Sequence, residues 1–219
     1  HLVAATIPNC KAYDPAFAGE MAVIVDRGMR EMLLEQQDVF YYITLMNENY
    51  AQPDLPAGVE DALLRGCYLF ARCDAGLPED APRLTLLGSG AILPEVRQAA
   101  ELLHAQGIAT DVFSVTSWSE LARDGQRCEQ ASMLGTGHDA AFITRLLAGT
   151  RGPVLAASDY VRAVPESIRA FMPEGRRYVT LGTDGFGRSD TRSALRAFFR
   201  VDAASIAQTA RYALGAQPL

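Results

Sequence analysis

Short apolar runs alternate with segments of helical periodicity from residue 84 to the end of the chain. The apolar runs are LTLLGSG, IATDVFSV, PVLAASD and RRYVTLG, and their composition is typical of buried strands. Apolar residues at helical spacing fill the segments between and after them: LPEVRQAAELLHAQG, SWSELARDGQRCEQ, HDAAFITRLLAG, YVRAVPESIRAFM, TRSALRAFF and DAASIAQTARYALG. Strands that alternate with helices predict an α/β fold, in which helices cover both faces of a mostly parallel sheet.

The residues before this alternation carry separate signals. LVAATI, residues 2 to 7, predicts a strand. Asp14 and Pro15 predict a helix start, with Asp14 as the N-cap and Pro15 at the first helical position. Helical spacing continues to about residue 34, and DVFYYITLM then predicts a buried strand. VEDALLRGCYLFARC predicts a helix that leads into an edge strand.

Two loops rich in Pro, Asn and Asp are the candidate domain boundaries, because these residues break both helices and strands. NENYAQPDLPAG is the stronger candidate and DAGLPEDAPR the second. The first divides the chain into residues 1 to 55 and residues 56 to 219. The chain opens on His1, without methionine and directly before an apolar run, so we expect a piece of a longer protein.

Composition excludes several classes of function. The formal net charge of −6 disfavours nonspecific binding to nucleic acid or to an anionic membrane. No stretch reaches the roughly 20 apolar residues of a bilayer span. Cys10, Cys67, Cys73 and Cys128 form no C-x-x-C pair and lie far in sequence from the histidines, so a zinc site is not expected. A chain with a large core needs no disulfide framework, and free thiols indicate a reducing cytoplasm.

Two glycine-rich loops could hold a phosphate or could be tight turns. In LLGSGAILPEV, Leu93 stands where a dinucleotide fingerprint needs its third glycine, so a plain connection from strand to helix is favoured. In GTDGFGRSD, two aspartates would repel a phosphate that Arg188 alone cannot hold, while Ser189 or Asp190 can cap the next helix. A structural turn is favoured, and a phosphate site is the alternative. The residues of this turn are Gly182, Asp184, Gly185, Gly187, Arg188 and Asp190.

Other candidate residues have no identifiable partner. Asp111 and Asp159 fall in or just after predicted strands, where α/β proteins often place functional groups, but no matching acid or base can be named. His104 ends a helix, and His138 lies near glycines at the start of another. The residues alone therefore predict an architecture and no complete active site.

A set of longer motifs indicates a protein family. HLVAATIPNCKAYDPAFAGEMAVI, YYITLMNENY, LLGSGAILPEVRQAAELL, DVFSVTSWSELARDGQ, ASDYVRAVPE and LGTDGFGRSDTRSALRAFFRVDA occur in this order. Together they closely resemble the C-terminal part of the homodimeric bacterial pyruvate dehydrogenase E1 component, a thiamine-diphosphate-dependent member of the transketolase superfamily. The resemblance covers nearly the whole chain and departs over residues 134 to 152 and at the last few residues.

The resemblance implies a three-domain parent. Residues 1 to 55 then form the end of its pyrimidine-binding middle domain, and residues 56 to 219 form its C-terminal domain. His1 matches a family histidine at the substrate end of the cofactor, and it could instead be a disordered first residue. Asn47, Glu48 and Tyr50 are candidates for the domain junction, with a solvated linker as the alternative. The motifs for thiamine diphosphate and Mg²⁺ are expected upstream, so no cofactor or metal is expected in this chain.

The implied parent decarboxylates pyruvate and passes the two-carbon unit to the lipoyl group of its E2 partner, dihydrolipoyl acetyltransferase. The chain itself is then expected to be inactive alone and to serve in packing against the homodimer mate. Two alternatives stay open at this point: a stand-alone α/β interaction module, and a nucleotide-binding module.

Overall fold

The computed structural model describes residues 1–215 and centres on a five-stranded sheet. The strands are β3 (Cys67–Cys73), β4 (Arg83–Gly88), β5 (Ala109–Val115), β6 (Val154–Ala157) and β7 (Tyr178–Leu181), in the order β3-β5-β4-β6-β7. Strands β5, β4, β6 and β7 are parallel, and β3 pairs antiparallel with β5 at one edge. The mostly parallel sheet and the edge strand predicted from the sequence are thus confirmed.

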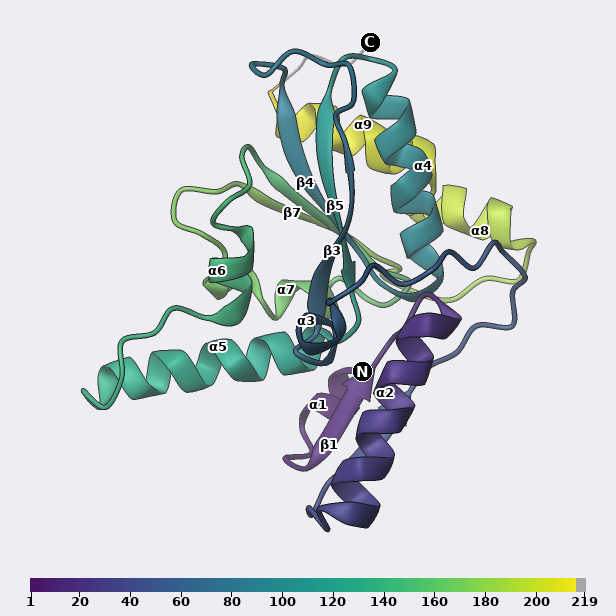
Figure 1. Cartoon of the computed structure of the whole chain (residues 1–219). Helices are drawn as coiled ribbons and strands as arrows, with labels where there is room; N and C mark the ends of the chain where they lie inside the picture. Colours follow the sequence, from purple (N-terminus) through teal and green to yellow (C-terminus); the bar gives the residue numbers. More distant parts are fainter. Residues whose placement is uncertain (216–219) are drawn as a thin grey trace.

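Helices cover both faces of this sheet (Figure 1). On one face lie α4 (Leu93–His104) and α9 (Ala203–Ala213), whose apolar side chains form one core with Leu84 and Leu86 of β4. The opposite face carries α5 (Trp118–Met133), α6 (Phe142–Leu147) and α7 (Ala163–Glu166), which pack against Leu87 of the same strand. Since successive strand residues point to opposite faces, burial on both sides explains why the predicted strands are continuously apolar.

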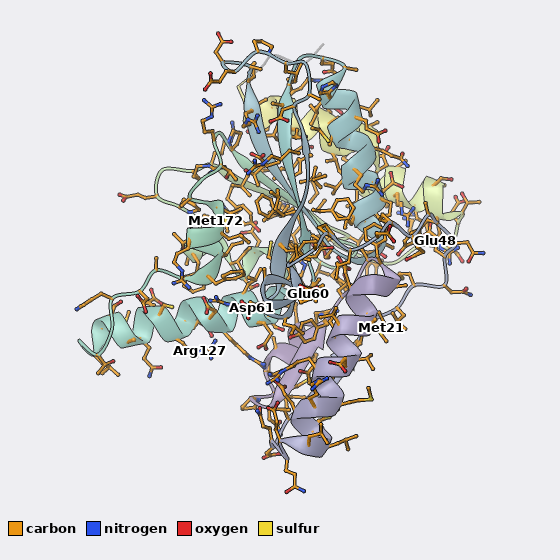
Figure 2. The ribbon with its side chains drawn as sticks, viewed as in Figure 1. Met21, Glu48, Glu60, Asp61, Arg127 and Met172 are labelled. Atoms are coloured by element: carbon orange, nitrogen blue, oxygen red, sulfur yellow. The ribbon has the colours of Figure 1, made fainter. Side chains whose placement is uncertain are left out.

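The N-terminal segment forms a smaller layer beside the sheet, at the bottom of Figure 1. It comprises α1 (Leu2–Ala5), β1 (Cys10–Tyr13), α2 (Ala18–Met29) with a π-helical turn (Arg30–Leu34), and β2 (Phe40–Ile43). Strands β1 and β2 are parallel. A third apolar cluster, with Tyr13, Ile24, Leu63 and Tyr68, joins this layer to α3 (Glu60–Leu64) and β3. Figure 2 places Glu60 and Asp61 of α3 between α2 and the sheet.

Three predictions for the N-terminal segment are wrong. LVAATI begins as helix α1, which buries none of its side chains; an apolar run this short has too few residues for its periodicity to separate helix from strand. Asp14 and Pro15 do not start a helix, because α2 begins at Ala18 and the carboxylate of Glu20 accepts the backbone N–H groups before its first turn. Strand β2 is not buried, since exposed and half-buried side chains alternate along it.

Helix α8 (Arg192–Phe199) follows GTDGFGRSD, and its cap also differs from the prediction. Thr191 is the N-cap, with its hydroxyl accepting the N–H of Ala194 at 3.3 Å. Asp190 instead accepts the N–H of Thr191 at 2.7 Å, one residue outside the helix, and Ser189 makes no cap. The four cysteines are free thiols. Among residues 1–215, no three His, Cys, Asp or Glu side chains gather as metal ligands, and no helix could cross a membrane.

Candidate functional site

Asp14 lies where the N-terminal segment meets the large sheet. Asp14 directly follows β1. Its backbone N–H donates to the carbonyl of Thr116 at 2.7 Å, and its backbone carbonyl accepts from the N–H of Gly90 at 3.1 Å. These bonds reach the segments that follow β5 and β4. Only 3% of Asp14 is exposed, so the backbone anchors hold a carboxyl group inside the junction.

A chain of hydrogen bonds joins this carboxyl to His1. Thr44, directly after β2, donates to Oδ1 of Asp14 at 2.7 Å, and its hydroxyl lies 3.1 Å from Nε2 of His1. Tyr160, from the loop after β6, donates to the same Oδ1 at 3.2 Å. The ring of His1 lies edge-on to those of Tyr160 and Tyr42, with centroids 4.5 Å and 5.5 Å away. His1, Thr44, Asp14 and Tyr160, which we call the Asp14 cluster, come from three separate parts of the chain.

The charge state of the Asp14 cluster is set mainly by burial. Burial raises the pKa of Asp14 above its usual value, and hydrogen bonds from Thr44 and Tyr160 only partly oppose this. Burial, together with the charge of Asp14, also raises the pKa of Tyr160, which keeps the phenol protonated as a donor. Within the described chain, Oδ2 of Asp14 and Nδ1 of His1 are buried without hydrogen-bond partners. Such atoms are uncommon in folded proteins, and the cluster can hold a proton and pass it between neighbours.

The glycine loop after β4 is closed around the same carboxyl group. Gly90 has a φ of +49°, and a Cβ on this residue would lie 2.5 Å from Oδ2 of Asp14. The hydroxyl of Ser89 accepts the indole N–H of Trp118 at 3.2 Å, and a hydrogen bond from Ser89 helps to lower the pKa of Asp14, so this hydroxyl also faces the carboxyl group. An acidic side chain thus fills the space in front of the loop, where a phosphate would need donors and positive charge. The loop does not fit a phosphate.

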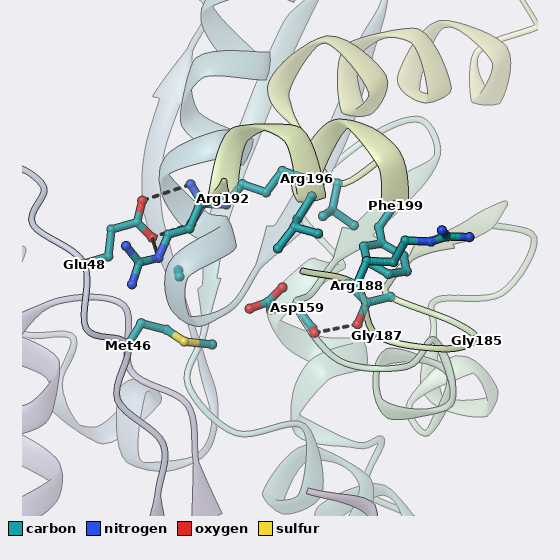
Figure 3. Close-up of a pocket in the computed structure, with 13 residues that line it drawn as sticks. Met46, Glu48, Asp159, Gly185, Gly187, Arg188, Arg192, Arg196 and Phe199 are labelled. Carbon is teal, nitrogen blue, oxygen red and sulfur yellow. Dashed lines mark hydrogen bonds and ion pairs between the residues drawn. The ribbon is translucent and has the colours of Figure 1, made fainter. Parts of the chain in front are cut away.

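A cavity of about 250 Å³ opens next to the Asp14 cluster (Figure 3). Its walls come from the linker after β2, from Asp159 after β6 and from α8. In Figure 3 the carboxyl group of Asp159 points into the cavity from below α8. Burial raises the pKa of Asp159, and the charges of Asp14 and Glu48 add to the rise while Arg196 opposes it. The cavity lies at the carboxyl ends of β4, β6 and β7, where open α/β sheets commonly bind ligands.

Charged contacts tie the linker to α8 along one side of this cavity. Glu48 accepts from Arg196 at 2.5 Å, and Arg196 also donates to Glu95 of α4 at 3.1 Å. The Arg192 Nε lies 3.7 Å from the same Glu48, and its guanidinium donates to the carbonyl of Asn47. Tyr50 donates to the carbonyl of Ala16 at 2.6 Å. Asn47 and Glu48 therefore contact the second segment through α8, and Tyr50 contacts the first through Ala16. Figure 2 shows Glu48 beside α8.

The segment GTDGFGRSD borders the cavity and is open to solvent on its outer side. Gly182 lies against the next loop, since a Cβ there would sit 2.4 Å from the carbonyl of Tyr160. Asp184 accepts the N–H of Arg162 at 2.8 Å, and Gly185 has a φ of +90°. Arg188 lies over the ring of Phe198 at 4.5 Å, and its guanidinium makes no ion pair in the described structure. Gly187 lines the cavity beside Arg188. That this segment acts as a turn and not as a binding site stays a prediction.

Two other sequence candidates have local roles. Asp111 accepts from Arg83 at 3.0 Å across neighbouring strands, and His104 bonds the carbonyl of Ala75 at 2.9 Å. Sequence reasoning missed Thr44 and Tyr160, and it gave Asp14 a capping role. Position gave a partial signal, since Thr44 lies near the end of one predicted strand and Tyr160 directly after another. Asp14 had no such signal, because it follows β1, which was not predicted.

Two models of known protein families match this chain. Residues 1–53 match a family model described as the pyruvate dehydrogenase E1 component middle domain, and residues 66–202 match one described as the transketolase-like TK C-terminal domain. The chain belongs to the transketolase-like C-terminal domain family. In this family member, the Asp14 cluster is formed where the two matched regions meet, with His1, Asp14 and Thr44 from the first and Tyr160 from the second.

Two relatives of this transketolase-like chain have the same name. The chain is 50% identical over 205 residues to the pyruvate dehydrogenase E1 component of Pseudomonas aeruginosa, covering 92% of this chain and 23% of the relative. The Escherichia coli protein of the same name is 43% identical over 210 residues, covering 94% of this chain and 23% of that protein. The chain therefore spans under a quarter of the length of these relatives.

Solved transketolases share the fold. The Campylobacter jejuni enzyme superimposes with a TM-score of 0.63 at 17% identity, over 95% of this chain and 27% of that one. A split-gene transketolase, whose structure is that of an inactive tetramer of its beta chain, superimposes with a TM-score of 0.60 at 18% identity, over 97% of this chain and 60% of that one. At such identities the likeness establishes the fold of the transketolase-like chain and nothing finer.

Proposed function

We propose that the chain is the end of the middle domain and the C-terminal domain of a pyruvate dehydrogenase E1 component. Its parent decarboxylates pyruvate with thiamine diphosphate and passes the acetyl unit to the lipoyl group of an E2 dihydrolipoyl acetyltransferase. The observation that carries the proposal is the succession of two matches, a pyruvate dehydrogenase E1 middle domain at residues 1–53 and a transketolase-like C-terminal domain at residues 66–202. The identity of 43–50% to proteins named as E1 components supports it.

His1 is the residue of this chain that we assign to the chemistry. The assignment rests on the family resemblance, and the structure supports it through the contacts of the ring. A first residue with no role would need no fixed contacts, whereas the ring of His1 bonds the half-buried Thr44 hydroxyl and lies edge-on to two tyrosine rings. An imidazole held in this way can exchange a proton near neutral pH.

Thiamine diphosphate and Mg²⁺ are assigned to the parent and not to residues of this chain. A diphosphate needs backbone donors and a cation, and here Asp14 fills the front of the glycine loop after β4. Within residues 1–215 no three acidic, histidine or cysteine side chains are arranged for a metal ion. We expect titration calorimetry of the chain with thiamine diphosphate and Mg²⁺ to give no saturable heat, and micromolar binding would contradict this assignment.

The second role that we propose for the chain is packing against a homodimer mate. Helix α8 buries none of its side chains, Phe186 of the preceding turn is 96% exposed and Phe198 is 56% exposed. Apolar side chains this exposed and this close in sequence are common at protein interfaces. In the parent, Phe186→Ser with Phe198→Ser should shift sedimentation from dimer toward monomer. An unchanged dimer would remove this segment from the interface.

A chimera tests the proposed activity. The matching region of the Pseudomonas aeruginosa relative, which is 50% identical, is replaced by this chain, and pyruvate-dependent reduction of an artificial electron acceptor is measured with thiamine diphosphate and Mg²⁺ present. We expect a rate within about tenfold of the unaltered relative, because a chain with the same function should place its residues as the relative does. A misplacement of about 1 Å would already lower the rate about 10²-fold. A folded, cofactor-binding chimera that does not turn over pyruvate would contradict the proposal.

A further inference from the structure

The hydroxyl of Thr44 can donate only one hydrogen bond, and three possible acceptors lie within reach. Oδ1 of Asp14 is 2.7 Å away, Nε2 of His1 (if this nitrogen carries no proton) is 3.1 Å away, and the carbonyl oxygen of Tyr13 is 3.3 Å away. The carboxyl oxygen is the nearest acceptor, and the shorter bond is the stronger one. With its proton directed to Asp14, the Thr44 oxygen is left to accept a hydrogen bond.

The donor to Thr44 is then the ring of His1. Nε2 of His1 lies 3.1 Å from the Thr44 oxygen, so this nitrogen carries the proton. In a neutral imidazole the other nitrogen is an acceptor. That nitrogen, Nδ1, is buried and has no partner within residues 1–215. The edge-on rings of Tyr160 and Tyr42 limit rotation of the imidazole, which keeps Nε2 directed at the Thr44 hydroxyl.

We propose that Thr44 and Asp14 are positioning residues, which hold His1 as the Nε2–H tautomer and leave Nδ1 as its proton-accepting atom. Neutral His1 in this state accepts a hydrogen bond or a proton at Nδ1, and it donates there only after protonation. Tyr160 assists by donating to the same carboxyl oxygen, which keeps Oδ1 of Asp14 as the acceptor for Thr44. The consequence for catalysis rests on the proposed function, whereas the tautomer is a property of the folded chain.

A purely structural reading of these bonds makes a different prediction. If Thr44 and Asp14 only stabilise the fold, their loss lowers the free energy of unfolding and leaves the tautomer of His1 as it is in the wild type. Thr116 provides a control of the same residue type: it is fully buried while Thr44 is half-buried, and its hydroxyl donates to the carbonyl of Leu63, away from His1. A variant of Thr116 therefore loses a buried hydroxyl without touching the chain to His1.

The test reads the ring nitrogens of His1 by NMR in the chain labelled with ¹⁵N-histidine, in which His104 and His138 are the other two histidines. We expect the wild type, Thr44→Ser, Asp14→Asn and the control Thr116→Val to show one tautomer with a proton at Nε2 that exchanges slowly with water. Thr44→Val and Asp14→Ala should lose the slow exchange and show averaged ring nitrogens. Thr44→Ser and Asp14→Asn restore the acceptor and donor atoms and so act as rescue variants.

Two outcomes would overturn the inference: a proton at Nδ1 in the wild type, or an unchanged His1 signal in folded Thr44→Val. The role in the reaction is measured separately in the parent enzyme, where we expect Thr44→Val to lower kcat for pyruvate about 10- to 100-fold and Thr44→Ser to restore it. Altered ring nitrogens with an unchanged kcat would support the positioning of His1 by Thr44 and would rule out a role of this positioning in the reaction. A parent that shows no pyruvate turnover in the wild type would contradict the proposed function and leave the tautomer result standing.

Discussion

Glu20 and Asp14 are two buried carboxyl groups at the same junction, and their surroundings differ. Glu20 is fully buried and accepts four hydrogen bonds, from the N–H groups of Ala16 and Phe17 at 2.5 and 3.2 Å and from the hydroxyls of Tyr68 and Ser114 at 2.7 and 2.5 Å. Asp14 accepts two, both at Oδ1, and its other oxygen has no partner in the described residues. A carboxyl with every position occupied can only hold the structure together, whereas one with a free position can take part in chemistry.

The difference follows from where each side chain lies. Glu20 belongs to the first turn of α2 and reaches β3 and β5 through Tyr68 and Ser114, so it joins the N-terminal segment to the large sheet. Asp14 lies at the carboxyl ends of the strands, where Thr44 joins it to His1 and Tyr160 donates to it. Asp159, the neighbour of Tyr160, lines the cavity of Figure 3. The following predictions test this division into a structural joint and a functional site.

The largest effect is expected for Glu20→Ala. This change leaves four buried donors without an acceptor and opens a space in the junction, so we expect a loss of about 3–5 kcal/mol in the free energy of unfolding. Urea denaturation measures it. Glu129→Ala on the exposed side of α5 is the control and should stay within about 0.5 kcal/mol of the wild type. If Glu20→Ala lowers the free energy of unfolding no more than Glu129→Ala does, Glu20 does not join the N-terminal segment to the large sheet.

Gly90→Ala should have the next largest effect, about 2–4 kcal/mol, because it adds strain at positive φ to a direct collision with the Asp14 carboxyl. Gly107 is the matched control, with a φ of +76° and open space around a Cβ. Gly107→Ala should cost only the conformational strain, about 1 kcal/mol. Equal losses in the two variants would show that Gly90 does not press on Asp14.

Asp14→Asn should cost less than about 1 kcal/mol at pH 7, because the amide nitrogen replaces the oxygen that has no partner. Its effect on pH dependence is more informative. Since burial raises the pKa of Asp14, the folded wild type binds a proton more tightly than the unfolded chain. The stability of the wild type relative to Asp14→Asn should then be highest below pH 3.8 and fall as pH rises above this value. A relative stability that rises with pH would contradict the raised pKa.

The smallest effects are expected at the cap of α8, which bonds neither carboxyl group. Thr191→Ala removes the observed N-cap and should cost about 0.5–2 kcal/mol, whereas Asp190→Ala, one residue outside the cap, should cost less than about 0.5 kcal/mol. Thermal unfolding of the two variants separates them. A larger loss for Asp190→Ala would restore this residue as the cap predicted from the sequence.

The large sheet could be predicted because each of its elements carries its own periodicity. IATDVFSV and SWSELARDGQRCEQ are a strand and a helix whatever surrounds them, and β5 and α5 form there. LVAATI could not be assigned, since four to six apolar residues fit either a strand or a single helical turn. At Asp14 the sequence does carry a capping signature, but Glu20 satisfies the start of α2 from inside the helix.

The Asp14 cluster could not be predicted because it depends on tertiary contacts between distant residues. Tyr160 lies 146 positions from Asp14 in the chain, and Thr44 lies 30 positions away. Asp159 was singled out for its place after a strand, while its neighbour Tyr160 is the residue that reaches Asp14. Because β1 and β6 belong to different sheets, only the packing of the N-terminal layer on the large sheet brings the loop after β6 next to the end of β1.

Hydrogen exchange in the Glu20→Ala variant tests the division most directly. If Glu20 is the joint, the amides of α2 should exchange at least about 100-fold faster than in the wild type, while those of β4 and β5 change little, because the N-terminal segment then opens by itself. Asp14→Asn should leave both regions near their wild-type rates. Equal acceleration of α2 and the large sheet in Glu20→Ala, or a selective opening of α2 in Asp14→Asn, would contradict the assignment of the joint to Glu20 and of the functional site to Asp14.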